Sequence, residues 1–165
     1  MNDRENDYQW AGPYLYSRQV IAVASDSDIQ TFDDLLRKNV GVQDTTRAAE
    51  LFFHTIDSAL PEVKQVNCFA TTEDMFAALR KGYVDAIAGH EALLNEFIIN
   101  GKGKYRLLDE SPYISKIGIA FQKGTHEELT QKIKEMSEDG TIGSIAEKYG
   151  LDAEKVVIRG GSDEK

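Results

Sequence analysis

Residues 39–51 read Asn-Val-Gly-Val-Gln-Asp-Thr-Thr-Arg-Ala-Ala-Glu-Leu, and this stretch decides the fold class. Val40 and Val42 predict a short strand, after which Thr45 or Thr46 opens a helix. The first turn of a helix carries backbone N–H groups without intrahelical partners, at the positive end of the helix dipole. Because open α/β folds bind ligands at such turns, the stretch predicts a candidate anion site. A helix start that binds no ligand has the same local pattern.

The composition is that of a folded, acidic protein. The chain has 165 residues, 41% of them hydrophobic, which is enough for one good-sized core or two small ones. A net charge of −9 without a basic stripe argues against nucleic acid or an anionic membrane as the main partner. The single cysteine, Cys68, excludes an internal disulfide, and its apolar surroundings predict a buried side chain.

Strands and helices alternate along most of the chain. Apolar runs predict strands at residues 18–25, 40–43, 63–70, 84–88, 105–108 and 117–121. Helical periodicity and capping residues predict a short helix capped by Thr31 and further helices at about 45–56, 72–81, 91–100, 127–138 and 141–149. Helices between short apolar strands indicate a mostly parallel sheet with right-handed crossovers.

Three sets of motifs stand in a fixed order: Arg4, Trp10 and Pro13-Tyr14; then Val40-Gly41-Val42-Gln43, Thr45-Thr46 and Gly82-Tyr83-Val84-Asp85-Ala86; then Gly118-Ile119-Ala120-Phe121-Gln122-Lys123-Gly124 and Asp139-Gly140-Thr141-Ile142 to Glu147-Lys148-Tyr149-Gly150. As a set, these motifs resemble the type II periplasmic solute-binding family, in the branch that serves polar amino acids and related small molecules. The resemblance extends from Arg4 to Tyr149 and therefore covers nearly the whole chain.

The resemblance implies an α/β fold with two lobes joined by crossing hinge strands, between which a ligand is held. Residues 1–17 would be a first-lobe segment leading into the hinge, 18–111 the second lobe, 112–157 the return crossing and C-terminal helices of the first lobe, and 158–165 a disordered tail. The hinge residues would be Tyr14, Ser17 and Tyr113.

In this family most of the first lobe precedes the segment that corresponds to Arg4, and this sequence does not contain that part. The helices that carry Leu129, Ile133 and Tyr149 would then lack a sheet to cover and would expose an apolar face. We therefore expect a fragment of a longer protein, a piece completed by another chain, or an exchanged dimer.

The resemblance also implies the carboxylate-binding residues. Arg4 stands where the family has an arginine that grips the ligand's carboxylate, although a solvated arginine paired with Asp3 or Glu5 has the same local pattern. Thr45, Thr46 and Arg47 stand where the family has a Gly-Thr-Thr type turn that contacts the same carboxylate. Here Thr45 replaces the glycine and narrows the approach of the backbone. Arg47 is either a second anion-binding group or a surface charge.

His90 is the most informative departure from the family. Amino-acid binders of the family usually carry an acid in this position, which pairs with the ligand's α-ammonium. An imidazole is a poor partner for an ammonium group. Either Glu91 takes that role in a shifted register, or the ligand is not an ordinary α-amino acid. A half-exposed cap residue is the purely structural interpretation of His90.

The sequence predicts a binding protein without a cofactor, because we find no metal-ligand spacing, nucleophilic constellation or nucleotide loop. The favoured function is binding of a small carboxylated solute, an amino acid or a related compound, by hinge closure. It would serve import through the membrane subunits of an ABC transporter, or sensing in a fused signalling module, in an extracytoplasmic location. The N-terminus of this chain is too polar for a signal peptide. The alternatives are a regulatory or interaction fragment with a degenerate pocket, a transcription-factor effector domain, and a dehydratase-like enzyme with Glu91 as general acid.

Overall fold

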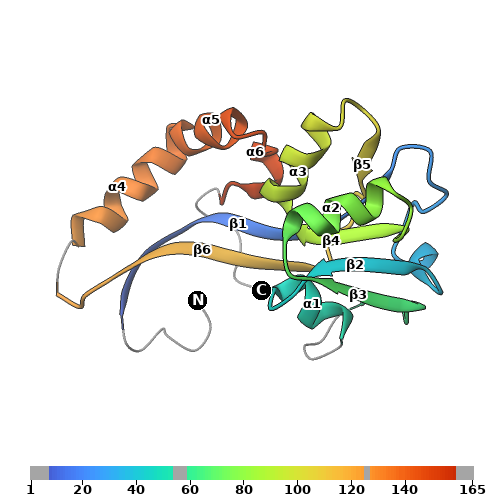
Figure 1. The fold of residues 1–165 in the computed structure, drawn as a ribbon. Coiled ribbons are helices and arrows are strands. Elements are labelled where there is room, and N and C mark those ends of the chain that lie inside the picture. Colours follow the sequence, from blue (N-terminus) through green and yellow to red (C-terminus); the bar gives the residue numbers. More distant parts are fainter. Residues whose placement is uncertain (1–7, 54–58, 125–126, 159–165) are drawn as a thin grey trace. The chain divides into compact units, whose positions relative to one another are not determined.

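The computed structural model describes residues 8–53, 59–124 and 127–158 (Figure 1). The strands are β1 Gln9–Ala24, β2 Asn39–Gln43, β3 Gln65–Phe69, β4 Ala86–His90, β5 Tyr105–Leu107 and β6 Tyr113–Phe121. The helices are a 3-10 turn η1 Asp33–Leu35, α1 Arg47–Phe52, α2 Thr72–Arg80, α3 Glu91–Asn100, α4 Glu127–Glu138, α5 Thr141–Lys148 and α6 Ala153–Val156. Contacts divide the chain into unit 1, Met1–Ser17 with Ile114–Lys165, and unit 2, Arg18–Tyr113.

The sheet of unit 2 has the strand order β3-β2-β4-β1-β5. β2 is parallel to both of its neighbours, β3 and β4, as the alternation of strands and helices predicted. β1 is antiparallel to β4 and β5, so the prediction of a mostly parallel sheet is wrong for this strand. An apolar run shows that a strand is buried but not in which direction it runs, and β1 enters the sheet from unit 1 rather than through a helical crossover.

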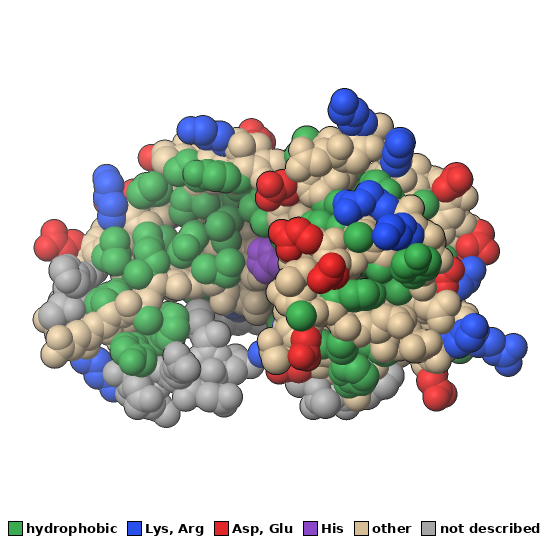
Figure 2. All heavy atoms as spheres, in the orientation of Figure 1, with side chains coloured by type: hydrophobic (Ala, Val, Ile, Leu, Met, Phe, Trp, Pro, Cys, Tyr) green, Lys and Arg blue, Asp and Glu red, His purple; other side chains and the backbone are tan. Residues whose placement is uncertain are grey.

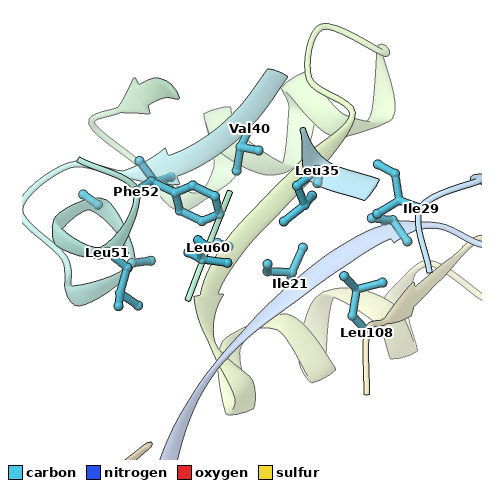
Figure 3. Close-up of a cluster of buried hydrophobic side chains, with 14 residues drawn as sticks. Ile21, Ile29, Leu35, Val40, Leu51, Phe52, Leu60 and Leu108 are labelled. Atoms are coloured by element: carbon cyan, nitrogen blue, oxygen red, sulfur yellow. The ribbon is translucent and has the colours of Figure 1, made fainter. Parts of the chain in front are cut away.

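Alternating side chains of β1 fill two apolar layers, one on each face of this sheet. Ile21 and Val23 pack with residues of α1 and η1, among them Leu35, Leu51 and Phe52 (Figure 3). Val20 and Ala22 point to the opposite face, where α2 and α3 contribute Met75, Leu79, Leu94 and Phe97. Each fully buried Leu, Ile or Phe side chain stabilises the fold by about 1.5–3 kcal/mol. Residues of β2 and β4 are buried in these layers as well, so both strands lie in the core of unit 2.

Two local predictions in unit 2 are corrected. Thr31 does not cap a helix: the turn is the 3-10 segment η1 with Phe32 in the cap position, and the carboxylate of Asp34 accepts the backbone N–H groups of Gln30 and Thr31. Cys68 is exposed and not buried. The reason is that β3 is an edge strand, paired only with β2 in the described part of the sheet, so its side chains are less covered than those of a central strand. Residues 54–56 of the helix predicted at 45–56 lie outside the described residues.

Unit 1 contains the first half of β1, most of β6, and the helices α4, α5 and α6. Its small core is built on Ala11, Ile133 and Ile142. α6 was not predicted, and Ile158, which we assigned to the tail, donates its N–H to the carbonyl oxygen of Tyr14 at 3.1 Å. Residues 159–165 lie outside the described residues.

An apolar surface extends over unit 1, and Figure 2 shows hydrophobic side chains gathered there. The large hydrophobic side chains that are exposed in unit 1 include Ile114, Ile119, Ile145 and Tyr149, the last of which is 72% exposed. A single soluble domain seldom leaves a contiguous apolar face of this kind uncovered. None of the described helices is both long enough and apolar enough to cross a bilayer.

Candidate functional site

The predicted residues of unit 2 lie at one edge of its sheet. β2 and β4 are parallel, with Val42 opposite Ala88, so their carboxyl ends meet at the same edge. The turn with Thr45, Thr46 and Arg47 follows β2. His90 is the last residue of β4, and Glu91 comes directly after it. The structure thus places five of the predicted ligand-binding residues on the side of the sheet where open α/β folds bind ligands.

The turn after β2 is held by hydrogen bonds of its own side chains. Thr45 has a φ of 59°, in the left-handed region that a β-branched residue seldom adopts. Its N–H donates to Oδ1 of Asp44 at 2.8 Å. Thr46 caps α1, because its hydroxyl oxygen accepts the N–H of Ala49 at 3.4 Å. The turn therefore adopts the backbone conformation that the glycine of the family would allow, at a cost in strain.

Arg47 is half-exposed, and its charge is partly matched. Its Nη1 lies 2.6 Å from Oε2 of Glu50, and its guanidinium carbon lies 5.2 Å from the centre of the Tyr113 ring. An exposed pair of this kind contributes at most about 1 kcal/mol, and so does an exposed cation–π contact. Both contacts are weak enough for an anion to compete for the guanidinium.

His90 is the N-cap of α3. Its Nδ1 accepts the backbone N–H of Ala92 at 3.3 Å. A ring nitrogen that accepts a hydrogen bond carries no proton, so the proton of the neutral imidazole is on Nε2. In this tautomer the outer nitrogen of His90 is a hydrogen-bond donor, which suits an acceptor on a ligand and not an ammonium group.

Glu91 is buried in an ion pair that the sequence analysis missed. It is 5% exposed, and its Oε1 lies 2.9 Å from Nη1 of Arg18, which is 7% exposed. Nη2 of Arg18 also donates to the carbonyl oxygen of Asp109 at 3.3 Å. The second carboxylate oxygen of Glu91, Oε2, is buried and has no hydrogen-bond partner among the described residues. Arg18 and Glu91 are 73 positions apart, so no local pattern could have paired them.

The remaining predicted residues lie elsewhere. Arg4 lies outside the described residues. Tyr14 and Ser17 belong to the β1 segment of unit 1, and Tyr113 begins β6 at the end of unit 2. Within unit 2, the hydroxyl of Ser111 donates to the carbonyl oxygen of Gln19 at 2.7 Å. This bond ties together the two chain segments that lead out of unit 2.

Across the described ranges, we find no group of three or more His, Cys, Asp or Glu side chains placed to hold a metal ion. The side chains at the edge offer hydrogen bonds and charges to a ligand. Arg47 supplies guanidinium donors and His90 an imidazole, and Glu91 supplies one acceptor oxygen that has no partner among the described residues. Such an edge can bind a small polar molecule that carries an anionic group.

Residues 11–137 match a protein family described as "ABC transporter, phosphonate, periplasmic substrate-binding protein". The chain belongs to this family of periplasmic substrate-binding proteins. The match covers more than half of the chain and includes the whole of unit 2. The family consists of substrate-binding proteins of transporters and not of enzymes, which confirms that part of the prediction.

Two binding proteins are similar to the chain along most of its length. ABC transporter arginine-binding protein 1 of Escherichia coli is 25% identical over 154 residues, which are 89% of this chain and 61% of that protein. The L-cystine-binding protein TcyA of Bacillus subtilis is 28% identical over 93% of this chain and 57% of its own length. The chain thus spans about three fifths of the length of these two relatives.

A solved structure of the same kind shows the fold. It is the second substrate-binding domain of a putative amino acid ABC transporter from Streptococcus pneumoniae, with a TM-score of 0.77 and 22% identity. The superposition covers 90% of this chain and 68% of that one. The likeness confirms the predicted type II periplasmic-binding-protein fold.

Proposed function

We propose that this chain is part of a solute-binding protein that holds a small carboxylated solute, an amino acid or a related compound, by hinge closure. The observation that carries the proposal is the gathering of residues 45–47 with His90 and Glu91 at the carboxyl ends of two parallel strands. A ligand shifts a hinge toward closure only if it makes contacts in the closed state that the open state lacks. Arg4, from the other lobe, is proposed to supply those contacts.

We assign the residues to two groups by the charge that each would meet. Arg4, Thr45, Thr46 and Arg47 are proposed to bind the solute's carboxylate, through guanidinium and backbone N–H donors. Glu91 is proposed to accept a hydrogen bond from the solute's amino group at Oε2, the buried oxygen that lacks a partner in the described structure. His90, whose Nδ1 is used by the helix cap, would donate from Nε2 to a further acceptor on the solute.

We infer the biological setting by analogy with the relatives. One relative is named as an arginine-binding protein of an ABC transporter and another as an L-cystine-binding protein. We propose that this chain likewise acts outside the cytoplasm and delivers its solute to the membrane subunits of a transporter. A sensor domain fused to a signalling module would use the same fold, and the solute site is the same in both cases.

The exposed apolar side chains of unit 1 are an argument that further structure packs against this unit. Ile119, Ile145 and Tyr149 are exposed in this unit. We propose that first-lobe structure covers this face, supplied by a longer form of the protein, a complementing chain or an exchanged dimer. Size-exclusion chromatography with light scattering tests the exchanged dimer, which requires twice the mass of the single chain; a compact, well-folded monomer contradicts it.

Thermal unfolding against a panel of amino acids, dicarboxylates, phosphonates, polyamines and short peptides tests the solute site. A compound present at about 100 times its dissociation constant adds about 2.7 kcal/mol to the free energy of unfolding. The shift is expected for one class of compound and should be lost in Arg4→Ala and weakened in Arg47→Ala. Lys132→Ala is the matched control, because Lys132 forms a similar exposed pair with Glu135 three residues along a helix.

The alternative function, a regulatory or interaction fragment, gives a different result in the same assay. A cooperative unfolding transition that no compound shifts would contradict a working solute site in this chain. The strained Thr45 and the Glu50 partner of Arg47 are the features that favour this alternative.

A further inference from the structure

Arg18 joins three segments of unit 2 at the edge that carries the candidate site. It is the first residue of unit 2 on β1, where its neighbour Gln19 lies opposite His90 of β4. Its guanidinium donates to Glu91, the first residue of α3, and to the carbonyl oxygen of Asp109, which lies between β5 and β6. One side chain therefore ties the start of α3 to both chain segments that lead out of unit 2.

The burial of this pair distinguishes it from the other ion pairs of the described structure. The side chains of Arg18 and Glu91 are 8% and 6% exposed, whereas in every other pair at least one member is mostly or half exposed. A buried ion pair is often no more stabilising than apolar side chains of similar volume, because both charges lose their hydration. A gain in stability therefore does not by itself explain why a buried ion pair is found at this position.

The unpartnered Oε2 of Glu91 strengthens this argument. Buried carboxylate oxygens in folded proteins almost always have a hydrogen-bond partner, and leaving one without a partner costs free energy. Arg18 could have satisfied both oxygens with its two terminal nitrogens, but it uses the second one for Asp109. The arrangement fixes the orientation of the carboxylate and leaves one oxygen for another donor.

We infer that Arg18 is a positioning residue of the solute site, which holds Glu91 and the start of α3 in the orientation that presents Glu91 Oε2 and His90 to the solute. This inference rests on the proposed function, since it assigns a role to Arg18 within that site. Arg18 does not contact the solute itself. It acts through Glu91 and through the N-cap bond between His90 and Ala92.

A comparison of Glu91→Gln with Arg18→Met/Glu91→Gln tests the inference without leaving a buried carboxylate uncompensated. Glutamine retains an oxygen that can accept from Arg18, so the single variant should keep the start of α3 in place. The double variant removes the brace. We expect the Ala92 amide to exchange with solvent at least tenfold faster in the double variant than in the single one, with changed ¹⁵N shifts of the His90 ring.

Solute affinity supplies the second measurement. For the compound of the panel that stabilises the wild type most, the double variant should bind at least tenfold more weakly than Glu91→Gln. Equal exchange at Ala92, equal His90 shifts and equal affinity in the two variants would overturn the inference. If no compound binds the wild type, the proposed function fails, whereas the exchange and NMR measurements still decide whether Arg18 positions the start of α3.

Two further variants guard against misfolding and unspecific effects. If the double variant does not fold, Arg18→Lys replaces it, because lysine keeps the charge but cannot form both fixed hydrogen bonds. Faster exchange at Ala92 in folded Arg18→Lys supports the inference, and wild-type exchange overturns it. Lys38→Met removes an exposed pair with Asp28 and should leave exchange at Ala92 unchanged, so a change in this variant as well would count against a specific role of Arg18.

Discussion

The hydroxyl of Thr46 donates to the carbonyl oxygen of Gln43 at 2.6 Å, so one side chain joins the end of β2 to the start of α1. The same oxygen accepts the N–H of Ala49 in the first turn of the helix. A hydroxyl can make both bonds at once because it has one hydrogen and two lone pairs. Thr46 thus links the strand to the helix in the turn that carries part of the candidate solute site.

Replacing Thr46 by valine should lower the free energy of unfolding by about 1–2 kcal/mol, the usual cost of losing a helix N-cap. Valine keeps the shape of threonine but can neither donate to Gln43 nor accept from Ala49. Urea unfolding of the two proteins measures the change. Thr72→Val is the control, because Thr72 is the first residue of α2 and its cap is the neighbouring Thr71. Equal losses in both variants would contradict the role assigned to Thr46.

Replacing Thr45 by glycine should raise the free energy of unfolding by about 1 kcal/mol. A β-branched residue in the left-handed region costs about 1–2 kcal/mol, which exceeds the entropy that glycine loses on folding. Chemical denaturation measures the gain. Arg37, with a φ of 62°, is the matched control: it is not β-branched, so Arg37→Gly should gain less. A loss of stability in Thr45→Gly would mean that its hydroxyl bond to the Asp44 carbonyl outweighs the strain.

Local signals were sufficient where a helix has a clear start and end. α3 occupies the predicted residues 91–100, between its cap His90 and Gly101, and α4 occupies the predicted residues 127–138. β4 instead lies two residues later than the apolar run at 84–88, because its register is set by Ala86, which pairs with both Val40 and Val23. Asp85 is tied to Asn39 by its backbone and its carboxylate, a contact between distant segments that no local pattern contains.

In the candidate site, too, local sequence signals predicted the helix starts but not the contact between distant segments. The turn after β2 and the cap of α3 were predictable, because threonine and histidine there occupy helix starts that follow apolar strands. The partner of Glu91 was not, because Arg18 reaches it only through the pairing of β1 with β4. The binding roles of these residues remain predictions until a solute is identified.

Asp34 should make stability depend on pH in the acidic range. Hydrogen bonds from the backbone N–H groups of Gln30 and Thr31 lower the pKa of the Asp34 carboxyl below its ordinary value of 3.8. A lowered pKa means that the stabilising contribution is present above pH 3.8 and is lost as the pH falls through the folded-state value. The difference in unfolding midpoint between wild type and Asp34→Asn should therefore be larger at pH 7 than at pH 2.

The control for this titration is Asp33→Asn, which leaves both backbone bonds to Asp34 intact. The difference in unfolding midpoint between wild type and Asp33→Asn should not change between pH 7 and pH 2 in the way expected for Asp34→Asn. A pH-independent difference between wild type and Asp34→Asn would show that the two bonds do not favour the ionised carboxylate.

Cys68 should react slowly with alkylating reagents although it is exposed at the sheet edge. Partial burial raises the pKa of its thiol above the ordinary value of 9.0, and the negative charge of Asp44 raises it further. Because the thiolate is the nucleophile, a raised pKa leaves less reactive sulfur at pH 8. The rate of iodoacetamide labelling, measured from pH 7 to 10.5, should therefore reach half of its maximum above pH 9.0.

The contribution of Asp44 to the reactivity of Cys68 can be tested separately. Asp44→Asn removes the negative charge but keeps an oxygen that can accept the N–H of Thr45, so the turn before α1 should be preserved. Loss of the repulsion favours the thiolate, and the labelling profile should move to lower pH by a fraction of a unit. Asp33→Asn removes one negative charge at a position that does not act on the thiol and should leave the profile unchanged. A profile that stays in place in Asp44→Asn would mean that burial alone raises the pKa of Cys68.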